Sequence, residues 1–280
     1  MADIRKTDSI TLFAMYAVVI VFTILAIYPI FWLVIQSFKT TQEYMTTSKL
    51  SLPVTWFFKN YPITWKTGNF GILILNSIFY TSITVFSVIS LSFMAGFAFA
   101  KIPSKFTPVL HGSFIIGILL TLQSILVPLF LMINAVGLYN TRLGVLIPYI
   151  GIGLPMAIYL STEFIKGIPG EILESARIDG ATYLKIFRSI IMPIASPVAA
   201  SVAVLMITGT WNEFMLINIL VSSNNIKSLP VGISMFSGAL ASDYGKQFAA
   251  LVIGMTPMII FYLVFRKRIT KGVAVGAVKG

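Results

Sequence analysis

Few side chains in this 280-residue chain are of the types that do chemistry, and they are widely scattered. Glu213 lies within a long apolar window, where an ionisable group is costly and is therefore a candidate functional residue. His111 is the single histidine, no acidic residue is close to it in the sequence, and the chain contains no cysteine. Metal binding and catalysis at membrane depth need clusters of such groups. We therefore expect no catalytic residue, no metal site and no enzymatic activity in this chain.

A second set of charged side chains lies in residues 163–197, a stretch that interrupts an otherwise apolar chain. Pro169 suits the first turn of a helix, and Glu171 and Glu174 follow at positions where the helix dipole favours acidic residues. Glu174 and Arg177 are spaced i, i+3, as in helical ion pairs. The opposing face is expected to be an apolar strip of Ile168, Ile172 and Ala176.

This first helix is expected to end at Asp179-Gly180, because glycine readily takes the left-handed conformation that closes a helix. A second, longer amphipathic helix should follow, and Pro193 should end it. Its apolar face would consist of Tyr183, Ile186, Phe187 and Ile190, and its polar face of Lys185, Arg188 and Ser189.

Two interpretations fit a helix, a tight turn and an amphipathic helix. The stretch could lie flat on the membrane surface. Alternatively, an exposed apolar strip with flanking acidic residues could fit a groove on a cytoplasmic partner. The bend at Asp179-Gly180 favours docking, because a helix that lies on a membrane needs no fixed bend.

The elements that must position these residues are membrane spans. The chain is 57% hydrophobic and 10% charged, whereas soluble domains are about 25% charged. A helix of about 20 apolar residues crosses a bilayer, and the apolar windows are continuous rather than alternating, which favours helices over a barrel. We expect an all-α integral membrane protein with six spans, near residues 10–35, 72–99, 112–136, 143–162, 198–221 and 248–265.

The net charge of +11 could indicate nucleic-acid binding, but the placement of the basic residues indicates a membrane orientation instead. Six spans put both termini and the 163–197 loop on one side, which carries most of the 20 basic residues. That side is therefore cytoplasmic, and the first apolar stretch is too long for a cleavable signal peptide. The exceptions lie in the first outer loop, at Lys39, Lys49, Lys59 and Lys66.

The 163–197 stretch resembles the "EAA" loop of permeases of ATP-binding-cassette (ABC) importers. Glu174-Ser175-Ala176 is followed by Asp179-Gly180-Ala181, and then by Ile190 and Pro193 at the expected distances. Ser175 replaces the usual alanine. The resemblance spans about residues 71–280 and is densest with the carbohydrate branch, through Leu75-Asn76-Ser77, Ala98-Phe99-Ala100-Lys101, Pro128, Leu138-Tyr139-Asn140-Thr141, Trp211-Asn212-Glu213-Phe214 and the final Gly276-Ala277-Val278-Lys279-Gly280.

The resemblance implies a type I importer fold: one transmembrane domain over 1–280, a permease core over 71–265 and a cytoplasmic coupling loop over 163–197. It implies that Glu174, Ser175, Ala176, Asp179, Gly180 and Ala181 contact a separate ATPase, with Glu174 facing a basic residue and Ala176 filling a cleft. The chain has no GxxxxGK[ST] phosphate loop, so ATP would be bound by the partner and this chain would need no cofactor. The implied partners are a second related permease, two ATPase subunits, an extracytoplasmic sugar-binding protein and membrane lipid, but no nucleic acid.

The function implied is ATP-driven import of a sugar or oligosaccharide across the cell membrane. The alternative is an ion-coupled secondary transporter, for which several intramembrane charges and internal repeats would be expected. Asn76, Asn212 and Glu213 are polar residues that could line a sugar path. The same groups could instead form hydrogen bonds between helices, and both interpretations remain open at this point.

Overall fold

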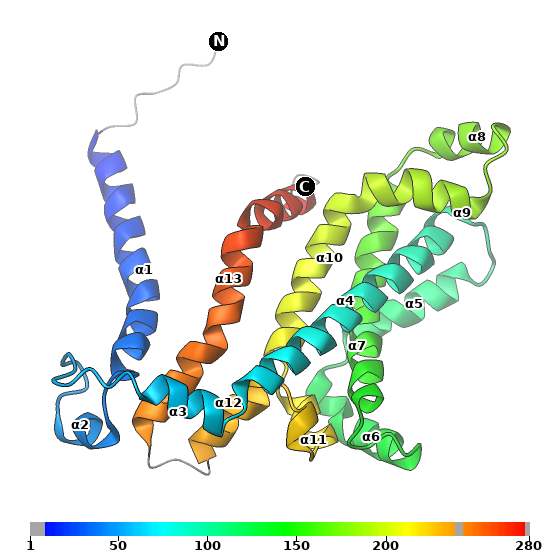
Figure 1. Cartoon of the computed structure of the whole chain (residues 1–280). Helices are drawn as coiled ribbons and strands as arrows, with labels where there is room; N and C mark the ends of the chain where they lie inside the picture. Colours follow the sequence, from blue (N-terminus) through cyan, green and yellow to red (C-terminus); the bar gives the residue numbers. More distant parts are fainter. Residues whose placement is uncertain (1–8, 239–242, 278–280) are drawn as a thin grey trace. The chain divides into compact units, whose positions relative to one another are not determined.

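The computed structural model describes residues 9–238 and 243–277, and this part of the chain contains helices and no strands (Figure 1). Residues 278–280, which end the sequence motif noted above, and the basic residues Arg5 and Lys6 near the N-terminus lie outside the described residues. The helices are α1 (Ser9–Gln36), α2 (Thr41–Thr46), α3 (Asn60–Thr67), α4 (Phe70–Lys101), α5 (Thr107–Ile118), α6 (Leu122–Ala135), α7 (Arg142–Lys166), α8 (Gly170–Ile178), α9 (Tyr183–Ile186), α10 (Met192–Asn212), α11 (Met215–Leu220), α12 (Leu229–Gly238) and α13 (Tyr244–Ala277).

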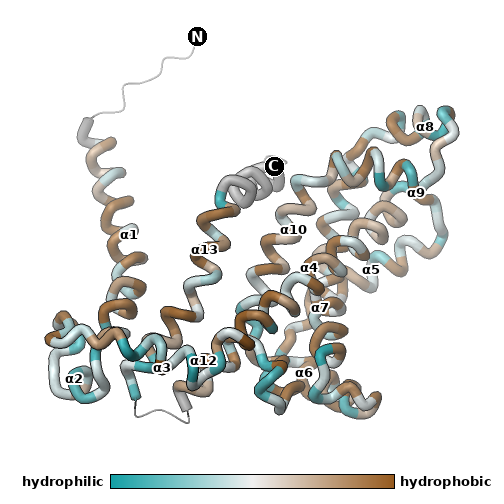
Figure 2. Tube along the Cα trace, in the orientation of Figure 1, coloured by the Kyte–Doolittle hydropathy of each residue, from teal (hydrophilic) through white to brown (hydrophobic). Residues whose placement is uncertain are grey.

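Five helical stretches are long and apolar enough to cross a membrane, and α5 with α6 can form a sixth span as a bent pair. In Figure 2 the long helices are mostly white to brown, and the most hydrophilic (teal) segments lie mainly near helix ends and in the connections. The expected all-α membrane fold is therefore confirmed, and so is the count of six spans when the bent pair is counted once.

Two of the expected spans are wrong in detail. The span expected over 112–136 is divided between α5 and α6, which meet at 107°. Thr121 is extended there, with φ −81° and ψ 143°, and its hydroxyl lies 2.8 Å from that of Ser124 at the start of α6. The span expected over 198–221 breaks after Asn212, and α11 begins only at Met215. A charge-free window records polarity and not the direction of the backbone, so neither break was visible in it.

The chain forms two compact units, of which the larger comprises Phe70–Gly232 and Met258–Gly280. Within it, α4 packs closely along α7. Ser161 on α7 donates a hydrogen bond to the carbonyl of Ser92 on α4 at 2.8 Å, and a β-carbon at Gly96 would lie 2.4 Å from the Ser161 hydroxyl oxygen. Small residues of this kind let membrane helices approach each other and bond across the interface. The packed pair α4–α7 positions the candidate sites described below, because their residues lie on these two helices or contact them.

The smaller unit comprises Met1–Asn69 and Ile233–Pro257, and it explains part of the unusual charge of the first outer loop. Lys39 is completely buried, and its ammonium donates to the Ser48 carbonyl at 3.1 Å and to the Ser51 hydroxyl at 3.0 Å. Burial lowers the pKa of Lys39, since desolvation disfavours the charged form. The ammonium of Lys49 lies 3.8 Å from the centre of the Tyr44 ring. Two of the four exceptional lysines are thus engaged inside this loop.

The close approach of α4 and α7 predicts a specific sensitivity at Gly96. Gly96→Val should destabilise the chain by about 1–3 kcal/mol, because the added carbons would overlap Ser161. Gly151→Val on α7 is the matched control, since a β-carbon there meets no atom within 4 Å. The thermal midpoints of the two variants in detergent would measure the difference, and equal midpoints would contradict the packing described here.

Candidate functional site

The first candidate site is centred on α8, which lies between the ends of two candidate spans, Lys166 and Tyr183. Pro169 immediately precedes the helix as its N-cap residue, rather than starting its first turn as expected. At the other end Gly180 has a φ of +78°, the left-handed conformation expected for it. The Ala181 amide donates to the Ala176 carbonyl at 2.9 Å and the Gly180 amide to the Arg177 carbonyl at 3.0 Å. This pair of bonds is a Schellman motif, which fixes where α8 ends.

The chain restarts at once after this turn. The hydroxyl of Thr182 accepts a hydrogen bond from the amide of Lys185 and caps α9. The helix then continues through one π-helical turn, Phe187–Ile191, directly into α10. Pro193 therefore does not end the second helix, as had been expected. Proline is tolerated there because it directly follows the π-helical turn, where the regular i→i−4 bonding of the α-helix is interrupted.

The buried face of α8 differs from the expected strip. Leu173 and Ala176 are buried, and both belong to a core cluster that also contains Ile168 and Ile186. Ile172 is 38% exposed, so the face toward the protein runs through Leu173 rather than through Ile172. Ala176 and Ile168 are thus not available as an exposed docking strip. Ala176 supports α8 from within.

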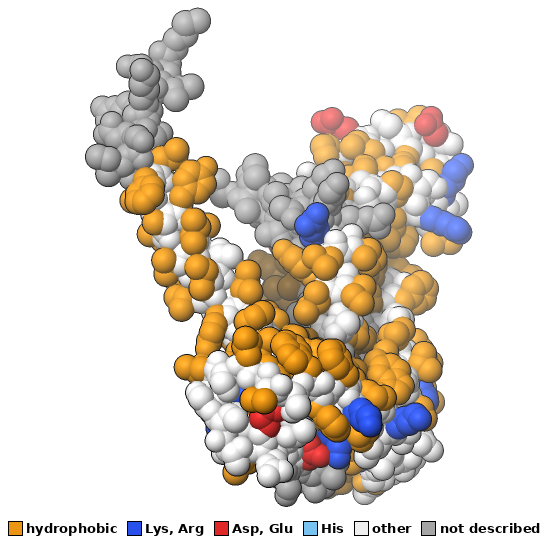
Figure 3. Space-filling view, turned by 60° about the vertical axis from the view of Figure 1, so that its left-hand side comes forward, with side chains coloured by type: hydrophobic (Ala, Val, Ile, Leu, Met, Phe, Trp, Pro, Cys, Tyr) orange, Lys and Arg blue, Asp and Glu red, His pale blue; other side chains and the backbone are white. Residues whose placement is uncertain are grey.

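The exposed face of α8 is acidic around one large apolar side chain. Glu174, Ser175 and Asp179 are exposed, and Ile178 is 86% exposed. Figure 3 shows acidic and basic side chains gathered at the end of the molecule that carries α8 and α9. The sequence reasoning missed Ile178, although its place beside Asp179-Gly180 at the helix end was a usable signal.

Arg177 does not pair with Glu174. Its guanidinium lies 5.1 Å from the centre of the Tyr183 ring, and no ion pair joins it to Glu174 among the described residues. A cation over an aromatic face is a favourable contact. The carboxylate of Glu174 therefore remains directed to the exposed side of α8.

The second candidate site is the helix break at Glu213. Its carboxylate accepts hydrogen bonds from the amides of Leu216 at 2.7 Å and Ile217 at 3.2 Å, at the start of α11. The hydroxyl of Tyr149 on α7 donates to the same carboxylate at 2.7 Å. Glu213 thus satisfies amides that the break would leave without partners. It also borders a cavity of about 190 Å³, to which Thr210 contributes a further polar side chain.

The other two path candidates have different environments. Asn76 is buried, and its amide group donates to the carbonyls of Asn225 and Lys227 at 2.9 Å each. Its oxygen accepts from the Arg142 guanidinium at 2.8 Å, so both the nitrogen and the oxygen of its side chain are hydrogen-bonded within the chain. Asn212 is exposed, and its amide donates to the Thr208 carbonyl at 3.0 Å within α10. Asn212 and Glu213 are neighbours in the sequence, but only Glu213 lines the cavity, and Asn76 belongs to another cluster.

That cluster holds the segment after α11 against α4. Besides the bonds of Asn76, the hydroxyl of Tyr80 donates to the Ile226 carbonyl at 2.8 Å and that of Ser77 accepts from the Leu229 amide at 2.9 Å. Asn140, with a φ of +56°, accepts from the amides of Ser222 and Ser223. The sequence reasoning gave Asn140 no such role. Residues 222–229 are accordingly fixed to the larger unit by these hydrogen bonds.

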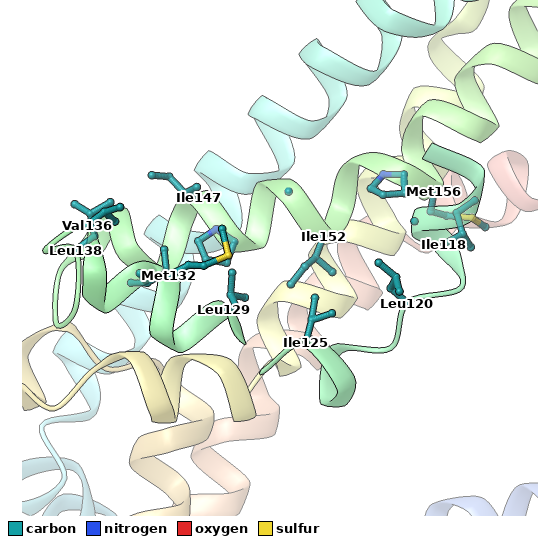
Figure 4. Close-up of a pocket in the computed structure, with 15 residues that line it drawn as sticks. Ile118, Leu120, Ile125, Leu129, Met132, Val136, Leu138, Ile147, Ile152 and Met156 are labelled. Atoms are coloured by element: carbon teal, nitrogen blue, oxygen red, sulfur yellow. The ribbon is translucent and has the colours of Figure 1, made fainter. Parts of the chain in front are cut away.

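A groove of about 640 Å³ lies between the bent pair α5–α6 and α7 (Figure 4). Its walls are hydrocarbon and thioether side chains, including Ile125, Met132, Ile152 and Met156. The groove offers no charged or hydroxyl side chain to a polar ligand. We therefore place the polar chemistry at Glu213 and on α8.

Comparison with known proteins gives consistent results. A family model described as "Binding-protein-dependent transport system inner membrane component" matches residues 5–275. The trehalose transport system permease protein of Mycobacterium tuberculosis is 32% identical over 91% of this chain and 93% of its own length. The multiple sugar-binding transport system permease protein of Streptococcus mutans is 31% identical over 98% of this chain and 100% of its own.

One solved structure shares the fold. It is a bacterial ABC transporter involved in the import of the acidic polysaccharide alginate, and one of its chains superposes with a TM-score of 0.82 at 23% identity. The match covers 95% of this chain and 99% of that one. The likeness supports the type I importer fold.

The capping role of Glu213 leads to a stability prediction. Glu213→Gln should lower the free energy of unfolding by about 1–3 kcal/mol, because a single amide oxygen cannot accept all three hydrogen bonds. Glu163→Gln makes the same chemical change at a half-exposed ion pair with Lys166 and should cost less than about 1 kcal/mol. Thermal unfolding of both purified variants tests this. Equal losses would show that Glu213 is not the cap of α11.

Proposed function

The chain belongs to the family of binding-protein-dependent transport system inner membrane components, and we propose from this premise how its geometry serves transport. It is the transmembrane permease subunit of an ATP-driven importer for sugars, and relatives at 30–32% identity are permeases for trehalose, diacetylchitobiose and multiple sugars. The ion-coupled alternative receives no support from any of these relatives. The observation that carries the mechanism is the exposed, rigidly ended α8 between two spans.

We infer that α8 is the coupling helix that docks on a separate ATP-hydrolysing subunit. Its exposed face offers carboxylates at Glu174 and Asp179 to basic residues of the partner, and Ile178 to an apolar cleft. Ser175 lies on the same face. Ala176 and Ala181 act from the inner side: Ala176 packs into the core, and Ala181 closes the Schellman motif at Gly180. ATP would be bound by that partner and not by this chain.

The permease works with other transporter components and a binding protein, as its family description implies. We propose the finer composition of one second, related permease and two ATPase subunits, with sugar delivered by an extracytoplasmic binding protein. The large apolar surface supports such an assembly in a membrane. The candidate span in α1, for example, consists almost entirely of apolar side chains, which need an apolar environment around them.

Sugar would pass close to the break between α10 and α11. Asn212 offers an exposed amide there, and Thr210 offers a hydroxyl to the cavity that Glu213 and Tyr149 also line. Uncharged polar groups of this kind can exchange hydrogen bonds with the hydroxyl groups of a sugar. Asn76 is assigned to the support of residues 222–229 instead.

The docking proposal predicts the outcome of two surface substitutions. Glu174→Lys and Ile178→Asp should each reduce the ATPase recovered with the permease roughly tenfold or more, since central interface residues commonly contribute 2 kcal/mol or more. Both side chains are exposed, so the membrane helices should remain folded. Ala176→Asp would be uninformative, because it places a charge in the core.

Co-purification of the assembled complex measures this effect, with Glu163→Lys as the matched charge reversal on an exposed acidic residue. Undiminished ATPase recovery with both α8 variants, together with normal transport, would contradict docking at α8.

The proposed orientation predicts which side of the membrane each loop occupies. We infer cytoplasmic termini and a cytoplasmic α8, because most basic residues then lie in the cytoplasm. Reporter fusions after Lys59 and Asn225 should read outside, and a fusion after Asp179 should read inside. A cytoplasmic signal at Asn225 would overturn this orientation.

A further inference from the structure

Lys101, the last residue of α4, contacts the elbow between α7 and α8, which we define as residues 166–169. The ammonium of Lys101 donates to the carbonyl of Ile168 at 2.5 Å and lies 3.4 Å from the carbonyl of Lys166. These carbonyls are more than 60 residues away in the sequence. Lys101 therefore joins the end of α4 to the end of α7 and to the start of the coupling segment.

The chemistry of this contact suits lysine. The last carbonyls of a helix have no partner within it, and they carry the negative end of the helix dipole. Lys166 is the final residue of α7, and Ile168 stands between it and α8. A single ammonium with several donors can bind two carbonyls that face the same point. A charge-assisted hydrogen bond is also stronger than a neutral one.

The same end of α4 also contacts the residues that follow α8. Phe97 is buried, and its ring centre lies 5.6 Å from that of Phe187 and 6.4 Å from that of Tyr183. The Tyr183 ring in turn carries the Arg177 guanidinium from the last turn of α8. The last two turns of α4 thus contact the chain on both sides of α8.

We propose that Lys101 is a positioning residue that fixes α8 to the end of α4, so that movement of α8 is transmitted directly to α4. The structural part of this inference concerns this chain alone. The transmission part rests on the proposed docking of an ATPase at α8. Without the ammonium, α8 keeps its Schellman turn and its buried Leu173 but loses its attachment at the elbow.

Amide hydrogen exchange of the full chain in lipid nanodiscs tests the structural part. Lys101→Met should speed exchange in residues 170–181 roughly tenfold, the factor that corresponds to one net hydrogen bond to a charged group. Lys101→Arg keeps a charged donor and should restore slow exchange. Lys105→Met is the matched control, because Lys105 is exposed and lies over the Phe106 ring, away from the elbow.

Unchanged exchange in Lys101→Met would overturn the proposal. If that variant does not fold, Lys101→Gln compared with Lys101→Arg decides the same question. Equal exchange in these two variants would also overturn it.

The ratio of ATP hydrolysed to sugar transported tests the transmission part in the assembled complex. Lys101→Met should raise this ratio several-fold while the ATPase stays bound, and Lys105→Met should leave it unchanged. An unchanged ratio would overturn transmission through Lys101. An ATPase that does not bind α8 at all would contradict the proposed function instead, and the exchange result would still stand.

Discussion

The backbone groups at helix ends set the conditions that the rest of this structure must meet. An α-helix leaves about four amides and four carbonyls without partners at its two ends, and hydrocarbon offers none. Three of the helix ends described above are met by a particular residue. Glu213 accepts from the amides of α11, Lys101 donates to carbonyls at and just after the end of α7, and Gly180 permits the bonds that close α8. The charged residues of this chain are few, and Glu213 and Lys101 both lie at helix ends.

The long helices between these ends form a frame with little freedom. Ser161 and Gly96 bring α4 and α7 together, and Gly153 admits Val88 and Met206 at the crossing with α10. Such contacts are short, and a protein interior tolerates added volume poorly. If the ATPase docks on α8 as proposed, a rigid frame would carry a displacement of α8 toward the cavity beside Glu213. On that proposal, coupling would depend on the α4–α7 packing.

The sequence was sufficient to predict the helices because hydrocarbon thickness dictates how long an apolar stretch must be. It was also sufficient for Gly180, because few residues other than glycine adopt a positive φ. It did not reveal the breaks at Thr121 and Glu213, since both lie inside apolar windows. It also misplaced the buried face of α8. Ile172 and Leu173 are adjacent on this nine-residue helix, and only its packing against the core cluster decides which of them is buried.

The π-helical turn between α9 and α10 changes the angular register of the chain. An α-helix advances 100° per residue, so accommodating one extra residue in a turn rotates everything downstream by about that amount. The side chains of Tyr183 and Ile186 on α9 therefore point in directions around the helix axis that differ from those a continuous α-helix with α10 would give them. Ile191, the last residue of this turn, and Ala195, which follows it, are both still buried in the core. A single-residue insertion or deletion in Phe187–Ile191 would therefore rotate α8 and α9 around the axis of α10. Both α9 and α10 would remain helical.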